Sequence, residues 1–232
     1  MWRNHAAGNL LTSIAVALCT KVFCTSSHSY TARFKKTVIM PAGIDTDAYK
    51  PVPGTVRKKY SVGMIGRVAP VKHVDLALEA MKEIVSSGGQ VSLSIVGSYL
   101  DRDKDYYNSV RRFVEENNLS SHVTFQEGVP PSKLPEIYSS LEICLNLTDS
   151  GSFDKTIVES ASCGAIPVVS NSSLKGIMPD ACIAEPNAKS VAESIQKMLL
   201  PHERIAVQKD LEKFVESQSL SNMLNKVFLE IN

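Results

Sequence analysis

The sequence predicts an α/β fold built on a doubly wound parallel sheet, and three observations support this prediction. Short apolar runs typical of strands alternate with stretches of helical periodicity between residues 60 and 200. Most of these runs end at a glycine or a small polar residue, as strands do where they open into loops. The composition, 44% apolar and 21% charged, is that of an ordinary globular protein. The regular alternation of strands and helices implies crossover connections and a parallel, Rossmann-like sheet.

The expected elements follow one another in a regular order. We expect strands over residues 22–24, 38–40, 60–65, 91–96, 123–125, 143–147, 166–169 and 181–184. We expect helices over residues 10–18, 74–85, 106–118, 133–139, around 159, and over 188–200, 206–215 and 220–231. Ligands of parallel sheets bind where the strands end, so several loops should share one edge. These loops begin at Gly66, Gly97, Gly128 and Asp149.

The charge and the cysteine content exclude several classes of protein. A net charge of +1 over 232 residues gives no basic footprint of the kind that nucleic-acid-binding proteins carry. The five histidines are scattered without ligand spacing, so we expect no protein-bound metal. The five cysteines are an odd number without a Cys-x-x-Cys pair, which argues against a disulfide framework. We therefore expect free thiols in a reducing, cytoplasmic compartment, at Cys19, Cys24, Cys144, Cys163 and Cys182.

The amino-terminal segment has two interpretations. Residues 10–19 are apolar and follow Arg3, as the core of a signal peptide would. The segment is too short to span a bilayer, and Leu18 stands where a cleavage site requires a small residue. The alternative is an amphipathic helix, with Leu10 and Ile14 on one face, that leads into a short strand.

The most informative stretch runs from Asp149 to Ser170. A loop of small and polar residues leads into a helix, Gly164 ends this helix, and an apolar strand follows. Main-chain N–H groups at the start of a helix are unpaired, and the helix dipole favours a phosphate there. Glu159 lies one turn further in, where its carboxylate can accept hydrogen bonds from a ribose diol. The alternative is that Glu159 is an incidental acidic residue on the exposed face of the helix.

A pair of basic residues follows the first strand of the regular region. Gly66 permits a tight turn, which carries Arg67 and Lys72 toward the ligand edge. An arginine offers a planar fork and a lysine a point charge, a combination suited to a diphosphate. The alternative is that both are surface cations that pair with Asp75 or Glu79. On spacing alone, this alternative is favoured.

Small-residue loops follow the next two strands of the sheet. Gly97-Ser98 and Gly128-Val129-Pro130 would allow the backbone to approach a flat nucleobase closely. Glycines after strands are common in every fold of this type, so these loops add little by themselves.

Taken together and in this order, the clusters resemble the carboxyl-terminal, donor-binding half of the family-four retaining glycosyltransferases. This family, glycosyl transferases group 1, has the GT-B architecture of two Rossmann-like domains that face a cleft. The resemblance covers roughly residues 20 to 200, and the last cluster is specific because it fixes many positions at once. The matching segments are residues 39–45, which are similar to the family's Pro-Asn-Gly-Ile-Asp connector, Gly66-Arg67 with Lys72, Val96-Gly97, 125–128 and 159–169.

The resemblance implies a role for each matching residue. Arg67 and Lys72 would bind the pyrophosphate of a nucleotide-sugar and stabilise the leaving diphosphate, as a metal ion does in other transferases. Glu159 would hold the ribose hydroxyls and complete the expected catalytic set. The donor substrate is then a nucleotide-sugar, no cofactor is needed, and a hexosyl group is transferred with retention. The expected donor-binding residues are Gly66, Gly97, Gly128, Val129, Ser152, Phe153, Asp154, Lys155 and Thr156.

Two departures from the family pattern limit what the resemblance implies. Family members commonly carry a first glutamate, in contact with the sugar, eight positions before the second, and here that position is Gly151. Asp149 or Asp154 could take over the sugar contact, or the contact could be lost. The amino-terminal domain, which would bind the acceptor, is absent apart from residues 4–26, which resemble its last helix and strand.

We therefore expect three segments and keep three hypotheses. The segments are residues 1–45 (remnant and linker), 46–200 (nucleotide-sugar-binding domain) and 201–232 (carboxyl-terminal helices).

The first hypothesis for the function is a glycosyltransferase whose acceptor-binding half is a separate chain, docked on residues 4–26 and the last helices. The second is a non-catalytic nucleotide-sugar-binding module or an inactive remnant. The third is an epimerase, for which no acid or base is apparent. A second copy could also cover the apolar segment. Nothing indicates nucleic-acid binding or, beyond loose association, a membrane.

Overall fold

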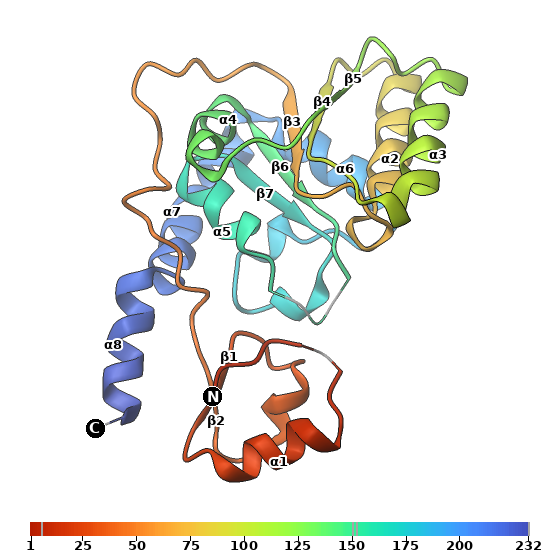
Figure 1. Ribbon diagram of the computed structural model, residues 1–232. Coiled ribbons are helices and arrows are strands. Elements are labelled where there is room, and N and C mark those ends of the chain that lie inside the picture. The colour runs from red at the N-terminus through yellow and green to blue at the C-terminus, as the bar shows by residue number, and fades with distance from the viewer. Residues whose placement is uncertain (6, 150, 152, 232) are drawn as a thin grey trace.

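The computed structural model describes residues 1–5, 7–149, 151 and 153–231 of the chain. Figure 1 shows a larger α/β domain with a small amino-terminal unit, coloured red to orange, beneath it. The sheet of the larger domain opens toward this unit at the edge where its strands end. The two parts therefore face each other across the edge at which ligands of such sheets bind.

The amino-terminal unit contains one helix and two short strands, as the sequence predicts. They are α1 (Leu10–Leu18), β1 (Val22–Cys24) and β2 (Thr37–Ile39), with a 3-10 helix, η1 (Tyr30–Arg33), between the strands. The side chain of Asn9 accepts a hydrogen bond from the Thr12 amide and so caps the start of α1. β1 and β2 pair in parallel and form a sheet of two strands.

Five parallel strands form the sheet of the larger domain, in the order β5-β4-β3-β6-β7. Their bounds are β3 (Ser61–Ile65), β4 (Ser92–Val96), β5 (Val123–Gln126), β6 (Ile143–Asn146) and β7 (Ile166–Val169). Each lies within two residues of its expected position. All residues of β3, β6 and β7 are buried, because helices cover both faces. The predicted doubly wound α/β sheet is therefore confirmed.

The predicted strand over residues 181–184 is wrong. The chain instead forms a 3-10 turn, η6 (Asp180–Cys182), in which the Cys182 amide donates to the Pro179 carbonyl. This turn leaves only Ile183 extended beside β7, where it forms an isolated bridge with Val169. The apolar run predicted burial of Cys182 and Ala184 correctly, but the 3-10 turn that begins after Pro179 occupies residues 180–182 and leaves too few extended residues for a strand.

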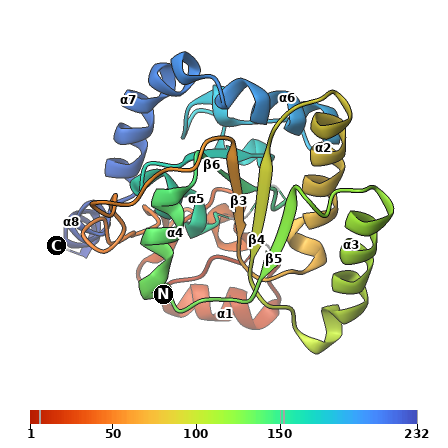
Figure 2. The ribbon, with the colours of Figure 1, turned by 90° about the horizontal axis from the view of Figure 1, so that it is seen from above.

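Helices cover the two faces of the sheet in separate layers (Figure 2). α2 (Val74–Ser86) packs between α3 (Lys104–Glu116) and α6 (Ala188–Met198) on one face. α4 (Leu134–Ser140) and α5 (Lys155–Ser162) lie on the other, and α7 (Pro201–Ser217) packs against both α5 and α6. These helices agree with the predicted ones, apart from their ends.

The core has one part on each face of the sheet. Leu78 and Met81 of α2 are fully buried in the larger part, and Tyr138 of α4 is fully buried in the smaller. Burial of an apolar side chain of this size contributes roughly 1.5–3 kcal/mol to the free energy of unfolding. The cysteines are free thiols, and burial raises the pKa of Cys144 and Cys163 to about 12, so they stay protonated at neutral pH.

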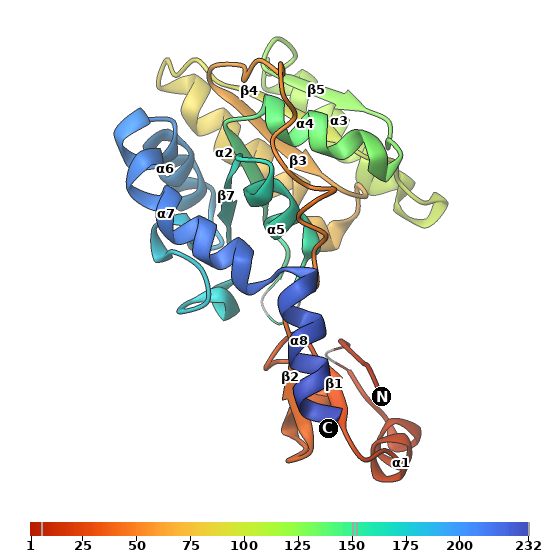
Figure 3. The ribbon, with the colours of Figure 1, turned by 90° about the vertical axis from the view of Figure 1, so that its left-hand side faces the viewer.

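The last helix returns to the amino-terminal unit (Figure 3). α8 (Leu220–Ile231) begins where the Leu220 amide donates to the Ile44 carbonyl at 2.7 Å. Near its end, Glu230 accepts a hydrogen bond from the Lys21 ammonium at 2.6 Å. α8 therefore runs beside β1 and β2 and links the first and last parts of the chain.

Candidate functional site

The order of the strands creates a crevice between β3 and β6. From β3 the chain proceeds outward to β4 and β5, and from β6 it proceeds in the opposite direction to β7. The loops that follow β3 and β6 therefore diverge and leave an opening between their carboxyl ends. A small cavity lies in this opening, and its polar lining residues are Arg67, Lys72, Asn146 and Thr148.

A glycine turn directs two cations toward this crevice. Gly66, directly after β3, has a φ of +138°, a conformation that residues with a side chain rarely adopt. Arg67 follows it and is exposed, and no ion pair includes it within the described part of the chain. A short 3-10 helix, η2 (Pro70–Lys72), then brings Lys72 back toward Gly66. The turn thus places a free guanidinium and a partly buried ammonium on one side of the crevice.

Lys72 pairs with Asp154, a residue 82 positions further along the chain. The side chains of Lys72 and Asp154 are 24% and 16% exposed, so the ion pair is largely shielded from solvent. Burial by itself would raise the pKa of Asp154, but the Lys72 charge and the hydrogen bonds to the carboxylate outweigh it and lower the pKa. The alternative pairing of Lys72 with Asp75 or Glu79 is therefore wrong.

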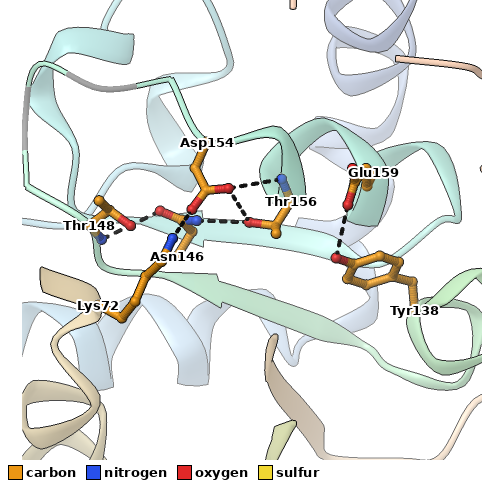
Figure 4. Close-up of polar contacts among 7 residues, drawn as sticks. All are labelled: Lys72, Tyr138, Asn146, Thr148, Asp154, Thr156 and Glu159. Atoms are coloured by element: carbon orange, nitrogen blue, oxygen red, sulfur yellow. Dashed lines mark hydrogen bonds and ion pairs between the residues drawn. The ribbon is translucent and has the colours of Figure 1, made fainter. Parts of the chain in front are cut away.

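Asp154 also begins the helix that carries Glu159. Its Oδ1 accepts hydrogen bonds from the amide of Thr156 at 3.2 Å and from Thr156 Oγ1 at 3.1 Å. Asn146, the last residue of β6, donates from Nδ2 to Thr156 Oγ1 at 2.8 Å. Figure 4 shows that Lys72, Asn146, Asp154 and Thr156 form one connected cluster. The start of α5 is thereby fixed against the carboxyl end of β6.

Thr148 adds a buried hydroxyl without a partner. Its amide donates to Asn146 Oδ1 at 3.4 Å, and its side chain lies in the crevice lining. Within the described residues, Thr148 Oγ1 is buried and makes no hydrogen bond. A buried polar atom of this kind is costly unless a ligand or water satisfies it.

Glu159 lies further along α5, next to a buried tyrosine. The hydroxyl of Tyr138 donates to Glu159 Oε2 at 3.2 Å (Figure 4). Burial raises the pKa of Glu159 above its ordinary value, the Tyr138 hydrogen bond opposes this, and the Asp154 charge raises it further. The half-buried carboxylate keeps one oxygen, Oε1, without a hydrogen bond in the described structure. This oxygen could accept hydrogen bonds from hydroxyl groups of a ligand.

The glycine loops bring main-chain segments into close contact. A Cβ atom at Gly97 would overlap the carbonyl group of Gly66, so only glycine fits between the ends of β3 and β4. The Gly128 amide is already occupied, because it donates to Ser98 Oγ at 3.2 Å. Val129 is half-buried and packs against the smaller part of the core. In the predicted loop Gly128-Val129, a nucleobase could therefore contact only the other main-chain groups.

The side chains of some predicted site residues lie outside the lining of the crevice. Phe153 packs against Phe214 of α7, with 6.5 Å between the ring centroids. Lys155 is exposed at the first position of α5 and is close enough to Glu159 to lower its pKa. Ser152 is outside the described residues. Asp149 is exposed and its Oδ1 lies 2.8 Å from Nε2 of His73.

Sequence reasoning missed three residues of the site, namely Tyr138, Asn146 and Thr148. Asn146 carried a usable signal, because a polar residue at the end of an apolar strand stands at the ligand edge of a parallel sheet. Tyr138 carried none, since an aromatic residue on a short helix is usually core. No group of three or more potential metal-ligating side chains occurs in the described residues.

The fold and the crevice define a class of protein. The five-stranded parallel sheet with its flanking helices matches the carboxyl-terminal domains of GT-B glycosyltransferases. The structure of Anabaena Alr3699/HepE in complex with UDP has a TM-score of 0.85 and 17% identity, over 99% of this chain and 71% of that one. The carboxyl-terminal domain of a glycosyl transferase group 1 family protein from Francisella tularensis aligns over 76% of this chain and 98% of its own, with a TM-score of 0.67 and 17% identity.

Sequence comparison then identifies the family. The family model "Glycosyl transferases group 1" matches residues 45–217, so the chain belongs to this family. The GPI3 subunit of the phosphatidylinositol N-acetylglucosaminyltransferase of Saccharomyces cerevisiae is 23% identical over 206 residues, which are 84% of this chain and 44% of that protein. The GDP-mannose-dependent phosphatidylinositol monomannoside mannosyltransferase of Mycobacterium tuberculosis is 27% identical over 113 residues, 45% of this chain and 28% of that protein.

The chain spans less than half the length of these curated relatives. No helix in the described residues is long and apolar enough to cross a membrane. The chain therefore belongs to the glycosyl transferases group 1 family and has the fold of the carboxyl-terminal domain of GT-B glycosyltransferases.

Proposed function

We propose that this chain binds a nucleoside-diphosphate sugar in the crevice between β3 and β6 and serves as the donor half of a retaining hexosyltransferase. The observation that carries the proposal is the arrangement of Arg67 and Lys72 beside the start of α5. A diphosphate there would meet two cations and the positive end of the α5 dipole. The Lys155 amide would donate to it, whereas the Thr156 amide is already bound to Asp154 Oδ1.

The same cations would assist the departure of the sugar. Negative charge grows on the diphosphate as the glycosidic bond breaks, and fixed positive charge nearby stabilises it. Arg67, which is unpaired in the described structure, and Lys72 would supply this charge without a metal ion. Retention would require the acceptor to attack from the face that the diphosphate leaves, so this half would contribute mainly stabilisation of the leaving group.

Glu159 would select the nucleoside part of the donor. Its carboxylate is held by Tyr138, which leaves Oε1 available to accept from the ribose hydroxyls. The main chain near Gly97 and Val129 would flank the base, since the side chains there are absent or packed into the core. The UDP-bound Anabaena structure is similar in fold and supports a uridine nucleotide as the first candidate.

A specific observation favours the second candidate, a non-catalytic nucleotide-sugar-binding module. The glutamate expected to contact the sugar is replaced by Gly151, and the two neighbouring carboxylates already have side-chain partners. Asp154 pairs with Lys72, and Asp149 pairs with His73. Donor binding without turnover would fit this arrangement.

We further propose that a separate acceptor-binding chain completes the cleft. Leu10, Leu11 and Leu18 of α1 are 72–83% exposed, and apolar side chains exposed together on one helix are typical of an interaction surface. Residues 1–44 contain five lysines and arginines and no aspartate or glutamate, so the partner would present an acidic face around an apolar centre. The relative named as a GPI3 subunit is by its name part of an assembly, which supports a partner.

Calorimetric titration of the purified chain tests the proposal. UDP, GDP and ADP and their sugar conjugates are added in the presence of EDTA, with Arg67→Ala as the variant and Arg112→Ala, on α3, as the control. We expect selective binding of one nucleotide to the wild type and the control, and strongly weakened binding to Arg67→Ala. Binding that requires a divalent metal, or that Arg67→Ala leaves unchanged, would contradict the proposed site.

A further inference from the structure

We infer that Asp154 is a latch on the diphosphate site: its carboxylate neutralises Lys72 in the empty protein, and a ligand must displace it to use this lysine. The inference rests on the proposed function of the crevice. It assigns Asp154 a positioning and regulatory role in place of the donor-sugar contact that the sequence left open.

The contacts of Asp154 leave little capacity for a sugar. Oδ1 accepts from the amide and the hydroxyl of Thr156, and Oδ2 accepts from Lys72. With only 16% of its side chain exposed, Asp154 could contact sugar hydroxyls only by giving up one of these partners. The bond to Thr156 caps α5, so the Lys72 partnership is the one that can be given up at less structural cost.

The position of Lys72 does not depend on the carboxylate alone. Its Cε lies 3.8 Å from the place that a Cβ at Gly66 would occupy, and 76% of its side chain is shielded from solvent. The η2 turn fixes its backbone, since the Lys72 amide donates to the Ala69 carbonyl at 2.9 Å. Without the Asp154 charge, the ammonium would therefore remain at the crevice, unpaired.

The charges in the crevice determine how Asp154 affects the binding of a diphosphate. In the empty protein, the carboxylate of Asp154 offsets the charge of Lys72, which leaves Arg67 as the uncompensated cation. A diphosphate that approaches Lys72 also approaches Asp154, and the repulsion between them reduces its affinity. The site thereby favours ligands with enough negative charge to compete with a carboxylate for Lys72.

The variant Asp154→Asn tests the latch. Asparagine is as good a helix cap as aspartate, so α5 keeps its start while the negative charge is removed. Titrated with UDP, GDP and ADP, Asp154→Asn should bind the preferred nucleotide about tenfold more tightly than the wild type. Its melting temperature without nucleotide should be lower, because the ammonium of Lys72 loses its partner.

Two further variants separate the latch from other effects. In a Lys72→Met background, the gain from Asp154→Asn should shrink to less than about threefold, because there is no ammonium to release. Glu142→Gln is the matched control: it breaks another shielded ion pair, with Arg204 at 2.8 Å, at the opposite edge of the sheet. This control should lower the melting temperature and leave nucleotide affinity unchanged.

The outcomes are distinct. Equal or weaker nucleotide binding by folded Asp154→Asn would overturn the latch and leave the proposed donor site intact. A full tenfold gain in the Lys72→Met background would also overturn it, since it would show repulsion alone. Binding of no nucleotide to either protein would overturn the proposed function and the latch with it.

Discussion

At the scale of single residues, the site depends on how each carboxylate is paired. Asp154 has a cation beside it and a lowered pKa, whereas Glu159 has a neutral donor and a raised pKa. Asp154 is therefore ionised and occupied, and Glu159 has an oxygen free for a ligand. The cap of α5 and an acidic residue within it thus differ in protonation behaviour because their partners differ.

Truncation of Glu159 tests its assignment to the ribose. Glu159→Ala should weaken binding of the nucleotide-sugar by about 1.5–3 kcal/mol, the range for a lost hydrogen bond to a charged group. Calorimetric titration measures the loss, with Glu79→Ala on the opposite helical layer as the control. An affinity equal to that of the wild type would remove Glu159 from the site.

The Tyr138 hydroxyl should control the pH range of binding. In the proposed site, the ionised form of Glu159 would accept hydrogen bonds from the ribose hydroxyls, so affinity should fall as the pH drops through the pKa of Glu159. Because the hydrogen bond from Tyr138 lowers this pKa, Tyr138→Phe should raise it. Titrations between pH 4 and pH 8 should therefore show the affinity of Tyr138→Phe falling at a higher pH than that of the wild type. Coincident profiles would contradict the coupling.

At the scale of elements, the sequence predicted the alternating helices and strands well, because their periodicity is local. The cluster at Gly66, Arg67 and Lys72 was also visible, because the turn and its cations are contiguous. The partnership of Lys72 with Asp154 was not visible, since 82 residues separate them and only the sheet order brings them together. The wrong strand over residues 181–184 has a different cause, because a local 3-10 turn after Pro179 replaced the extended conformation that the apolar run predicted.

The close contact between the ends of β3 and β4 predicts that a side chain at Gly97 would disturb the site. Gly97→Ala would place a methyl group against the Gly66 carbonyl, so the turn that carries Arg67 must shift. We expect a loss of stability of about 1–3 kcal/mol, as overpacking typically costs, and loss of nucleotide binding. Urea unfolding and calorimetry measure the two effects.

Gly88→Ala is the comparison for this junction. Gly88 lies in the loop after α2 with a φ of +82°, and no atom lies within 4 Å of the added methyl group. Gly88→Ala should lower the free energy of unfolding only by the backbone strain, about 1 kcal/mol, and leave nucleotide affinity unchanged. Equal effects of the two variants on binding would show that the contact with Gly66 is unimportant for the site.

At the scale of the whole molecule, charge and apolar surface are distributed unevenly. Residues 1–44 hold five basic and no acidic residues, which leaves 20 basic and 24 acidic residues in the remainder. The outer surfaces of α1 and α8 expose leucines, among them Leu18 at 83% and Leu229 at 82%. Such a surface, beside the edge where the ligand crevice opens, is what the proposed partner would cover.

Without a partner, this surface should promote self-association. We expect sedimentation velocity at micromolar concentrations to show species larger than the monomer for the wild type. Leu11→Gln combined with Leu18→Gln should shift the distribution toward the monomer and leave nucleotide affinity unchanged, because α1 lies outside the crevice. A wild-type chain that is monomeric throughout would contradict the role assigned to this surface.

The most direct test of the account is a crystal structure of the chain with UDP, or with whichever nucleotide calorimetry selects. We expect the diphosphate beside the start of α5, within hydrogen-bond distance of Arg67 and Lys72, with the ribose at Glu159. A nucleotide bound elsewhere would contradict it. The alternative location most worth inspecting is the cavity of about 550 Å³ between Arg57 and Arg204 at the far end of α5.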